Sequence, residues 1–291
     1  GASFYGAGRL QATSVADPTG IVPLALGAAL IVVLVVYQYR KRDPLMPVKP
    51  MSTSVPVTGI YIALTASAAA FGIMELALQV LKTSSTPTDT ALLFLPEFVA
   101  AVAVAGLFGA LFRTRFTPVL ALSGLLTVVA AAAVLLVALP SGGALVAVTA
   151  GLLGLGVAAS VSPALFMAGF SLRSQLLQRV FALIELLRGV TAFLVAPILV
   201  FLAGVLSPSK ATGTADAVWI CLAIAVLGFV GGTALYVRGK GRLQTPDIDR
   251  WQEEGEPAWD SPPLFGRGRR GSGDAVPDVP SSSGAKGPGA T

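Results

Sequence analysis

The chain has 291 residues, of which 54% are hydrophobic and only 12% are charged, and its mean hydropathy is +0.79. Soluble domains carry about 25% charged residues, so this composition excludes a soluble domain and indicates a polytopic membrane protein. The net charge of +5 does not indicate nucleic-acid binding, because most basic residues flank apolar stretches. One cysteine and no histidine exclude an internal disulfide, His or thiolate metal sites and Ser-His triads, so we expect no metal and no cofactor.

The chain begins with a small, polar stretch, residues 1–19, which we predict to be an extracytoplasmic loop. It starts at Gly1 without a signal peptide, so we expect the natural beginning of the protein to lie further upstream. Residues 20–37 form the first predicted span. Tyrosines and a basic cluster follow it and mark a cytoplasmic interface: Tyr37, Tyr39, Arg40, Lys41 and Arg42. Four prolines then make residues 43–56 a cytoplasmic linker.

Six further apolar stretches are each long enough to cross a hydrocarbon core about 30 Å thick. They cover residues 57–81, 91–112, 116–139, 144–170, 180–206 and 217–237. With the first span they predict an all-α fold of seven transmembrane helices. Within the stretch 144–170, small residues recur at spacings of three and four, which predicts close helix packing. These are Gly151, Gly154, Ala158 and Ser162.

The remainder, residues 243–291, is rich in proline, glycine, serine and charge, and we predict a disordered cytoplasmic tail. Lysine and arginine are concentrated on one side of the predicted spans, which places the C-terminus in the cytoplasm. That side holds Arg40, Lys41, Arg42, Lys49, Arg113, Arg115, Arg173, Arg179, Arg238, Lys240 and Arg242, and the other side holds Arg9, Lys82 and Lys210.

Two carboxylates interrupt the helical hairpin of residues 57–116. Glu75 lies in its first apolar stretch and Glu97 in its second, each about 9 Å from the polar turn 82–90 at 1.5 Å per residue. The two acids are therefore expected at similar depth on antiparallel helices. An ionisable group inside a bilayer costs at least about 2.5 kcal/mol, so each is a candidate functional residue.

Glu75 belongs to a stripe of polar and small residues on one face of its helix. The polar members are Tyr61, Thr65, Glu75 and Gln79. This pattern predicts a cavity-lining helix with a protonatable acid, and the alternative is a glutamate that forms hydrogen bonds within a packed bundle. Glu97 follows Pro96, so it is either a second proton carrier or an acid favoured at a helix start.

Two other charged groups are candidates. Glu185 and Arg188 are three residues apart, so they face the same way and can neutralise one another, either as a structural pair or as a gate. Gly109, Arg113 and Arg115 form a tight basic turn on the cytoplasmic side of the hairpin.

Residues 109–119 resemble the second-half copy of the cytoplasmic loop motif of the major facilitator superfamily, G-x-L-x-D-R-x-G-R-[KR]. Gly109 and Leu111 match it, with Arg113 or Arg115 as its basic residue, although Arg113 stands where the motif has aspartate. Residues 39–48 and 171–197 are similar to segments of the fourteen-span drug:proton antiporter branch of that superfamily.

The resemblance covers residues 20–237 and implies the last seven of fourteen spans. Residues 57–242 would form the six-helix C-terminal transporter bundle, preceded by one span and its linker at 20–56. It further implies an alternating-access secondary transporter in the plasma membrane that exports small, drug-like molecules in exchange for protons. Its partners would be membrane lipid, the small-molecule substrate and a missing N-terminal half of the transporter.

Two other functions stay open. A seven-span receptor or scaffold with a partner-binding cytoplasmic tail fits the odd number of spans. A lipid-active membrane enzyme is a third reading, but the sequence offers no nucleophile with a base and no metal cluster, so we expect no enzymatic activity.

Overall fold

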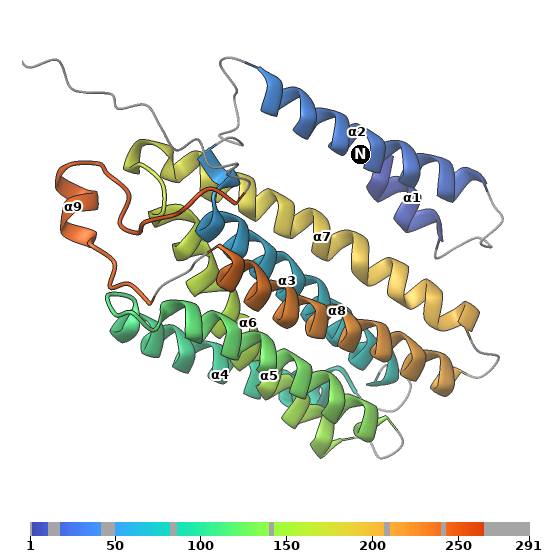
Figure 1. The fold of residues 1–291 in the computed structure, drawn as a ribbon. Coiled ribbons are helices and arrows are strands. Elements are labelled where there is room, and N and C mark those ends of the chain that lie inside the picture. The colour runs from blue at the N-terminus through green and yellow to red at the C-terminus, as the bar shows by residue number, and fades with distance from the viewer. Residues whose placement is uncertain are drawn as a thin grey trace, which may run out of the picture.

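The structure is a computed structural model that describes residues 2–10, 18–41, 50–81, 86–139, 143–206, 210–239 and 243–264. In these ranges the regular structure is helical (Figure 1). The α-helices are α1 (Ala2–Leu10), α2 (Pro18–Arg40), α3 (Ser54–Leu81), α4 (Pro87–Leu111), α5 (Thr117–Ala138), α6 (Ala144–Phe170), α7 (Leu177–Leu206), α8 (Lys210–Arg238) and α9 (Ile248–Glu253). Seven of them, α2 to α8, are long and apolar enough to cross a membrane, which confirms the predicted number of spans.

Helices α3 to α8 form one bundle with α3 and α6 at its centre. Helix α6 packs against α3, α4 and α5, and α3 also packs against α7 and α8. Accordingly, α3 and α6 are the most buried of the spanning helices, whereas α2, α4 and α7 are the least buried. The rest of the described chain thus leaves much of α4 and α7 uncovered, although α1 and α8 also contact α7.

Small residues bring the helices of this core close together. A Cβ atom at Gly59 of α3 would collide with the carbonyl oxygen of Ala164 in α6. A Cβ atom at Gly154 of α6 would collide with the carbonyl oxygen of Glu97 in α4, and one at Gly151 would lie 3.4 Å from the Pro96 Cβ atom. The close packing predicted for residues 144–170 is therefore confirmed at Gly151 and Gly154.

The N-terminal region differs from its prediction. Part of the loop expected at residues 1–19 is the helix α1, which packs between α2 and α7 at the edge of the bundle (Figure 1). Gly6 allows this contact, because a Cβ atom there would lie 2.7 Å from the carbonyl oxygen of Gly20. The sequence signal was weak because α1 is short and only partly apolar.

Several helices begin earlier than the apolar stretches that predicted them. Helix α4 starts at Pro87 instead of residue 91, because the Thr86 hydroxyl caps it by accepting a hydrogen bond from the Asp89 amide at 3.2 Å. Helix α8 starts at Lys210, seven residues before the apolar stretch 217–237 that predicted it. The first turn of such a helix is polar, so a prediction based on apolar stretches places the start of the helix too late. The predicted connections at 82–85, 140–142 and 207–209 lie outside the described residues.

The spanning helices alternate in direction, so their connections gather at two ends of the molecule. One end holds the starts of α3, α5 and α7 and the ends of α2, α4, α6 and α8. Residues 243–264, which we call the strap, also lie at this end, and we refer to it as the strap end (Figure 1). The other end is called the opposite end.

The strap corrects the prediction of disorder from residue 243 onward. It contains α9 and packs on the bundle, with Trp259 only 6% exposed. Composition alone predicts disorder here, since the segment is polar, but two tryptophans and a set of backbone hydrogen bonds give it a docking surface. The tail beyond residue 264 lies outside the described residues.

Candidate functional site

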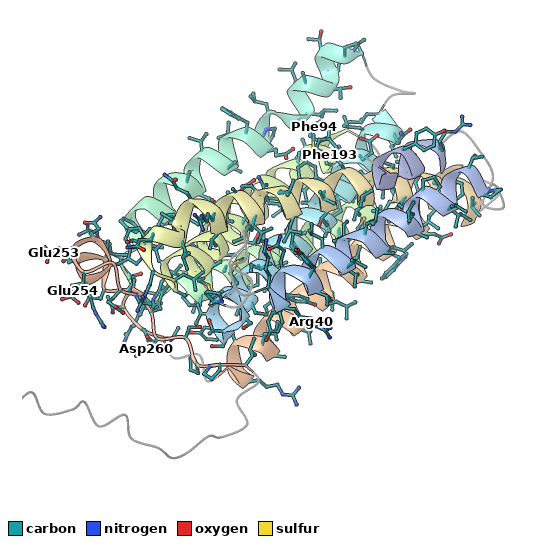
Figure 2. All side chains as sticks on the ribbon, turned by 90° about the horizontal axis from the view of Figure 1, so that it is seen from above. Arg40, Phe94, Phe193, Glu253, Glu254 and Asp260 are labelled. Carbon is teal, nitrogen blue, oxygen red and sulfur yellow. The ribbon has the colours of Figure 1, made fainter. Side chains whose placement is uncertain are left out.

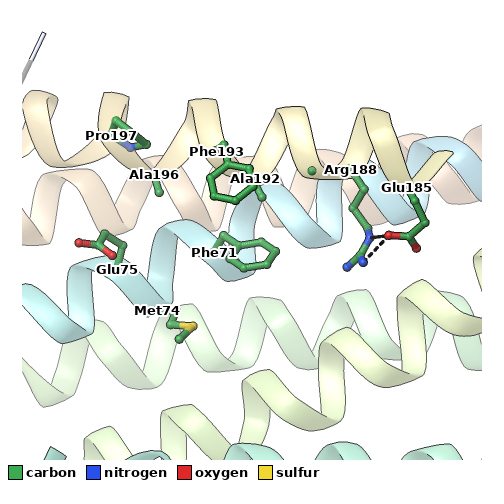
Figure 3. Close-up of a pocket in the computed structure, with 10 residues that line it drawn as sticks. Phe71, Met74, Glu75, Glu185, Arg188, Ala192, Phe193, Ala196 and Pro197 are labelled. Carbon is green, nitrogen blue, oxygen red and sulfur yellow. Dashed lines mark hydrogen bonds and ion pairs between the residues drawn. The ribbon is translucent and has the colours of Figure 1, made fainter. Parts of the chain in front are cut away.

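An elongated pocket of about 520 Å³ lies between α3 and α7 (Figure 3). Its wall is mostly apolar, and the charged groups stand toward its two ends, with Glu75 near one end and the pair Glu185–Arg188 at the other (Figure 3). The lining residues are Phe71, Met74, Glu75, Glu185, Arg188, Gly189, Ala192, Phe193, Ala196 and Pro197.

Glu75 is a half-buried side chain of α3, six residues before the helix ends at Leu81. Its carboxylate accepts a hydrogen bond from the Gln79 amide one helical turn later, at 3.3 Å. The i, i+4 spacing places both side chains on one helix face, as the polar stripe predicted. Figure 3 places the Glu75 carboxylate across from Pro197 of α7.

Glu185 and Arg188 form an ion pair on α7. The Arg188 guanidinium donates to the same Glu185 oxygen, at 3.1 Å from Nε and 2.6 Å from the terminal nitrogen. The two side chains are 46% and 27% exposed, respectively, so the pair faces the pocket and its mouth and is not enclosed. From Glu185 to Pro197, twelve residues of helix span about 18 Å, which is the length of the pocket along α7.

A second pocket, of about 350 Å³, lies beside the first and is formed by α3, α4 and α6. Glu97 contributes the carboxylate among the residues that line this pocket. The wall also includes Phe94 and Phe98 of α4 and Gly154 of α6. Met74 lines both pockets. The two hairpin acids therefore occupy adjacent pockets that share the Met74 side chain, one acid in each.

The interpretation of Glu97 as a helix-start acid is wrong. Helix α4 begins at Pro87, and Pro96 lies inside it. Glu97 is ten residues beyond Pro87, or about 15 Å along the axis, where the field of the helix N-terminus has faded. The electrostatic stabilisation that favoured a purely structural role is therefore missing, and Glu97 stands half-buried in an apolar wall.

The structure separates Tyr61 and Thr65 from the acids on the same helix face. The Tyr61 hydroxyl donates to the carbonyl oxygen of Leu227 in α8 at 3.0 Å, and the Thr65 hydroxyl donates to the Tyr61 carbonyl at 2.8 Å. Gly228 and Gly231 of α8 make room for these two side chains. Tyr61 and Thr65 thus hold α3 against α8, and they line neither of the two pockets described above.

The basic turn between α4 and α5 lies at the strap end, away from both pockets. Gly109 faces open space. The exposed Arg113 and Arg115 side chains lie over neighbouring rings, with Arg113 Cζ 5.6 Å from the centroid of Phe112 and Arg115 Cζ 5.4 Å from that of Phe116. These contacts favour a role in anchoring the turn at the membrane interface.

Sequence reasoning missed the apolar residues that join these groups into a site. Met74 was not singled out, and Phe193 gave no signal because it is one apolar residue among many in α7. In the described part of the chain, no group of three or more His, Cys, Asp or Glu side chains could hold a metal ion. The site can instead take an apolar molecule against its aromatic wall, and its carboxylates can accept a proton or a cation.

No model of a known protein family matches the chain, and no curated protein is significantly similar to it in sequence.

Proposed function

We propose that the chain is part of a secondary active transporter that works by alternating access and exports small, drug-like molecules in exchange for protons. The observation that carries this proposal is the pair of adjacent pockets, each with a carboxylate in an apolar wall and both lined by Met74. A bilayer-embedded acid marks a path for substrates or ions more often than a structural contact, because its insertion is costly.

The uncovered faces of α4 and α7 support a second helical bundle as the partner. Both helices flank the pockets, and Phe98 and Phe193 are each 70% exposed there. Exposed apolar side chains alone fit a lipid-facing surface. Carboxylates do not, so the face that carries Glu75, Glu97 and Glu185 is expected to meet protein or water. In this proposal the two bundles rock around a site between them.

The distribution of basic residues supports a plasma-membrane orientation with the C-terminus in the cytoplasm. At the strap end, the ends and connections of the spanning helices hold seven described basic residues, and the opposite end holds Arg9 and Lys210. The seven are Arg40, Lys41, Arg113, Arg115, Arg173, Arg179 and Arg238.

The test is Glu75→Gln in the complete transporter, with proteoliposomes that contain a pH-sensitive dye and ethidium as the transported probe. Glutamine keeps the shape and hydrogen bonding of glutamate but cannot exchange a proton. We expect the variant to exchange ethidium across the membrane at equilibrium, and to lose accumulation driven by a proton gradient and the accompanying pH change.

Two controls make this test specific. Glu97→Gln shows whether the acid of the neighbouring pocket contributes to the same step. Asp89→Asn removes an exposed acid from the first turn of α4, so this variant should leave transport unchanged. Gradient-driven ethidium transport at the normal rate in Glu75→Gln would rule out the coupling role. Absence of ethidium and proton movement in the unsubstituted protein, across a panel of efflux probes, would reject the transporter itself.

A further inference from the structure

The strap supplies hydrogen-bond partners to the beginning of α3. The Ser54 amide donates to the carbonyl oxygen of Pro262 at 2.9 Å, and the Val55 amide donates to the Ser261 hydroxyl at 3.0 Å. The first amides of a helix have no partner within the helix, so they must be satisfied from outside. Two of these positions in α3 are satisfied by the strap, which comes about 200 residues later in the chain.

The same segment binds the end of α6 and its connection to α7. The Ala258 amide donates to the Phe170 carbonyl at 2.8 Å, and the Trp251 indole donates to the Leu172 carbonyl at 3.0 Å. The Trp251 and Phe170 rings lie 4.4 Å apart. The Ser174 amide donates to the carbonyl oxygen of Gly255 at 3.2 Å. The connection that precedes α7 is therefore held at three successive points.

The strap is also closed on itself by hydrogen bonds between its two ends. The Asp260 amide donates to the Gln244 side chain at 3.1 Å, and the Trp259 indole donates to the Gln244 carbonyl at 3.4 Å. Between these ends, Gly255 has a φ of +72° just after α9, a conformation that favours glycine and turns the chain back toward Ser174.

Trp259 gives the strap a buried anchor. It belongs to the apolar cluster that includes Val55 of α3, Ala121 of α5 and Met167 of α6. Aromatic side chains bury a large apolar area, so the burial of Trp259 in this cluster contributes to the docking free energy of the strap. Buried Ile248 and Ala258 and the Trp251–Phe170 ring contact add to this anchor. The exposed ion pair of Arg173 and Glu256 at 3.7 Å contributes little.

We infer that residues 243–264 are an intramolecular clamp that ties the start of α3 to the α6–α7 connection and thereby fixes the first turns of α7. Helix α7 needs such support, because it is among the least buried spanning helices. The strap holds the chain up to Ser174, three residues before α7, and the pocket begins at Glu185, eight residues into α7. Release of the strap therefore frees the start of the helix that forms this wall of the pocket. The inference concerns the bundle alone and holds whatever the pockets bind.

The test measures distances between spin labels on α5 and α7 by pulsed electron paramagnetic resonance, in a Cys221→Ala background. One pair, Val119→Cys and Gln178→Cys, reports the strap end. A second pair on the same two helices, Val137→Cys and Val205→Cys, reports the opposite end. All four positions are exposed.

The strap is weakened in two ways, each with a matched control. Trp251→Ala is compared with Trp219→Ala, which removes an exposed tryptophan of α8. A chain that ends after Leu243 is compared with one that ends after Leu264 and keeps the strap. Ser261→Ala removes a single hydrogen bond to α3 and serves if the larger changes reduce folding.

We expect the strap-end distance to shift or broaden by more than about 2 Å, the scale of helix displacements at interfaces, in Trp251→Ala and in the chain ending at Leu243. Ser261→Ala should give a smaller change in the same direction. The opposite-end distance and both control variants should keep the original distribution. Unchanged strap-end distances in every weakened variant would overturn the inference, and so would equal changes at both ends, which indicate general loosening.

Discussion

At the scale of single residues, the ion pair of Glu185 and Arg188 shows how a charge is tolerated on a spanning helix. Each group neutralises the other at 2.6 Å, while the pair remains partly open to the pocket. Removal of one partner leaves an uncompensated charge on an apolar helix, and this costs more than the pair itself contributes.

We therefore expect Glu185→Ala and Arg188→Ala each to lower the yield of folded protein in the membrane by several-fold. The double substitution Glu185→Gln with Arg188→Met removes both charges and should restore most of the yield. Size-exclusion chromatography of detergent-solubilised protein, detected by fluorescence, measures the folded fraction. Normal yield in both single variants would show that the pair is dispensable.

At the same scale, the sequence predicted the polar residues at the site better than their apolar surroundings. Glu75, Gln79, Glu185 and Arg188 could be found because a polar side chain is conspicuous in an apolar helix. Met74 could not, because its importance comes from lining two pockets, which four helices (α3, α4, α6 and α7) create together.

At the scale of elements, close contact between α4 and α6 depends on the absence of a side chain at Gly154. A methyl group there would meet the Glu97 backbone, which cannot move aside as a flexible side chain could. The position of Glu97 is thus set by a glycine on the neighbouring helix.

We expect Gly154→Ala to separate α4 from α6 and to destabilise the bundle by about 1–3 kcal/mol, the usual cost of overpacking. Gly106→Ala in α4 is the control, since the added methyl group would face open space, with nothing beyond its own turn of helix within 4 Å. It should be neutral or slightly stabilising, because alanine favours helix. A thermal unfolding assay in detergent compares the two, and equal melting temperatures would contradict the expected clash.

Element positions were predictable and element ends were not. Long apolar runs fixed the seven spans, because few other structures bury so many apolar residues in succession. Helix starts at Pro87 and Lys210 escaped prediction because capping and first turns use polar residues. The packing of α8 against α3, which places Tyr61 and Thr65 beside α8 and leaves Glu75 to α7, joins segments far apart in the sequence.

At the scale of the whole molecule, the asymmetry of basic residues predicts which end faces the cytoplasm. Figure 2 shows Arg40, Glu253, Glu254 and Asp260 all toward the end where the strap lies. The strap thus adds acidic groups to a basic end. The positive-inside rule counts lysine and arginine and gives acids little weight, so its prediction is unchanged.

Cysteines introduced one at a time in the Cys221→Ala background test this orientation. At the opposite end, Thr88→Cys and Asp216→Cys should react with a membrane-impermeant maleimide on intact cells. At the strap end, Arg115→Cys and Gln178→Cys should react only after permeabilisation. All four sites are exposed. The reverse labelling pattern would invert the whole arrangement.

The distribution of tryptophan gives the protein an optical reporter of its own. Of its three tryptophans, two lie in the strap and the third, Trp219, is 59% exposed on α8. Trp219→Phe would leave intrinsic fluorescence that arises from Trp251 and Trp259 alone. Docked, the buried Trp259 emits in an apolar environment, and release into water shifts its emission to longer wavelength. A simple emission spectrum could then follow the strap in real time, without any attached dye, as ligand, pH or membrane composition is changed.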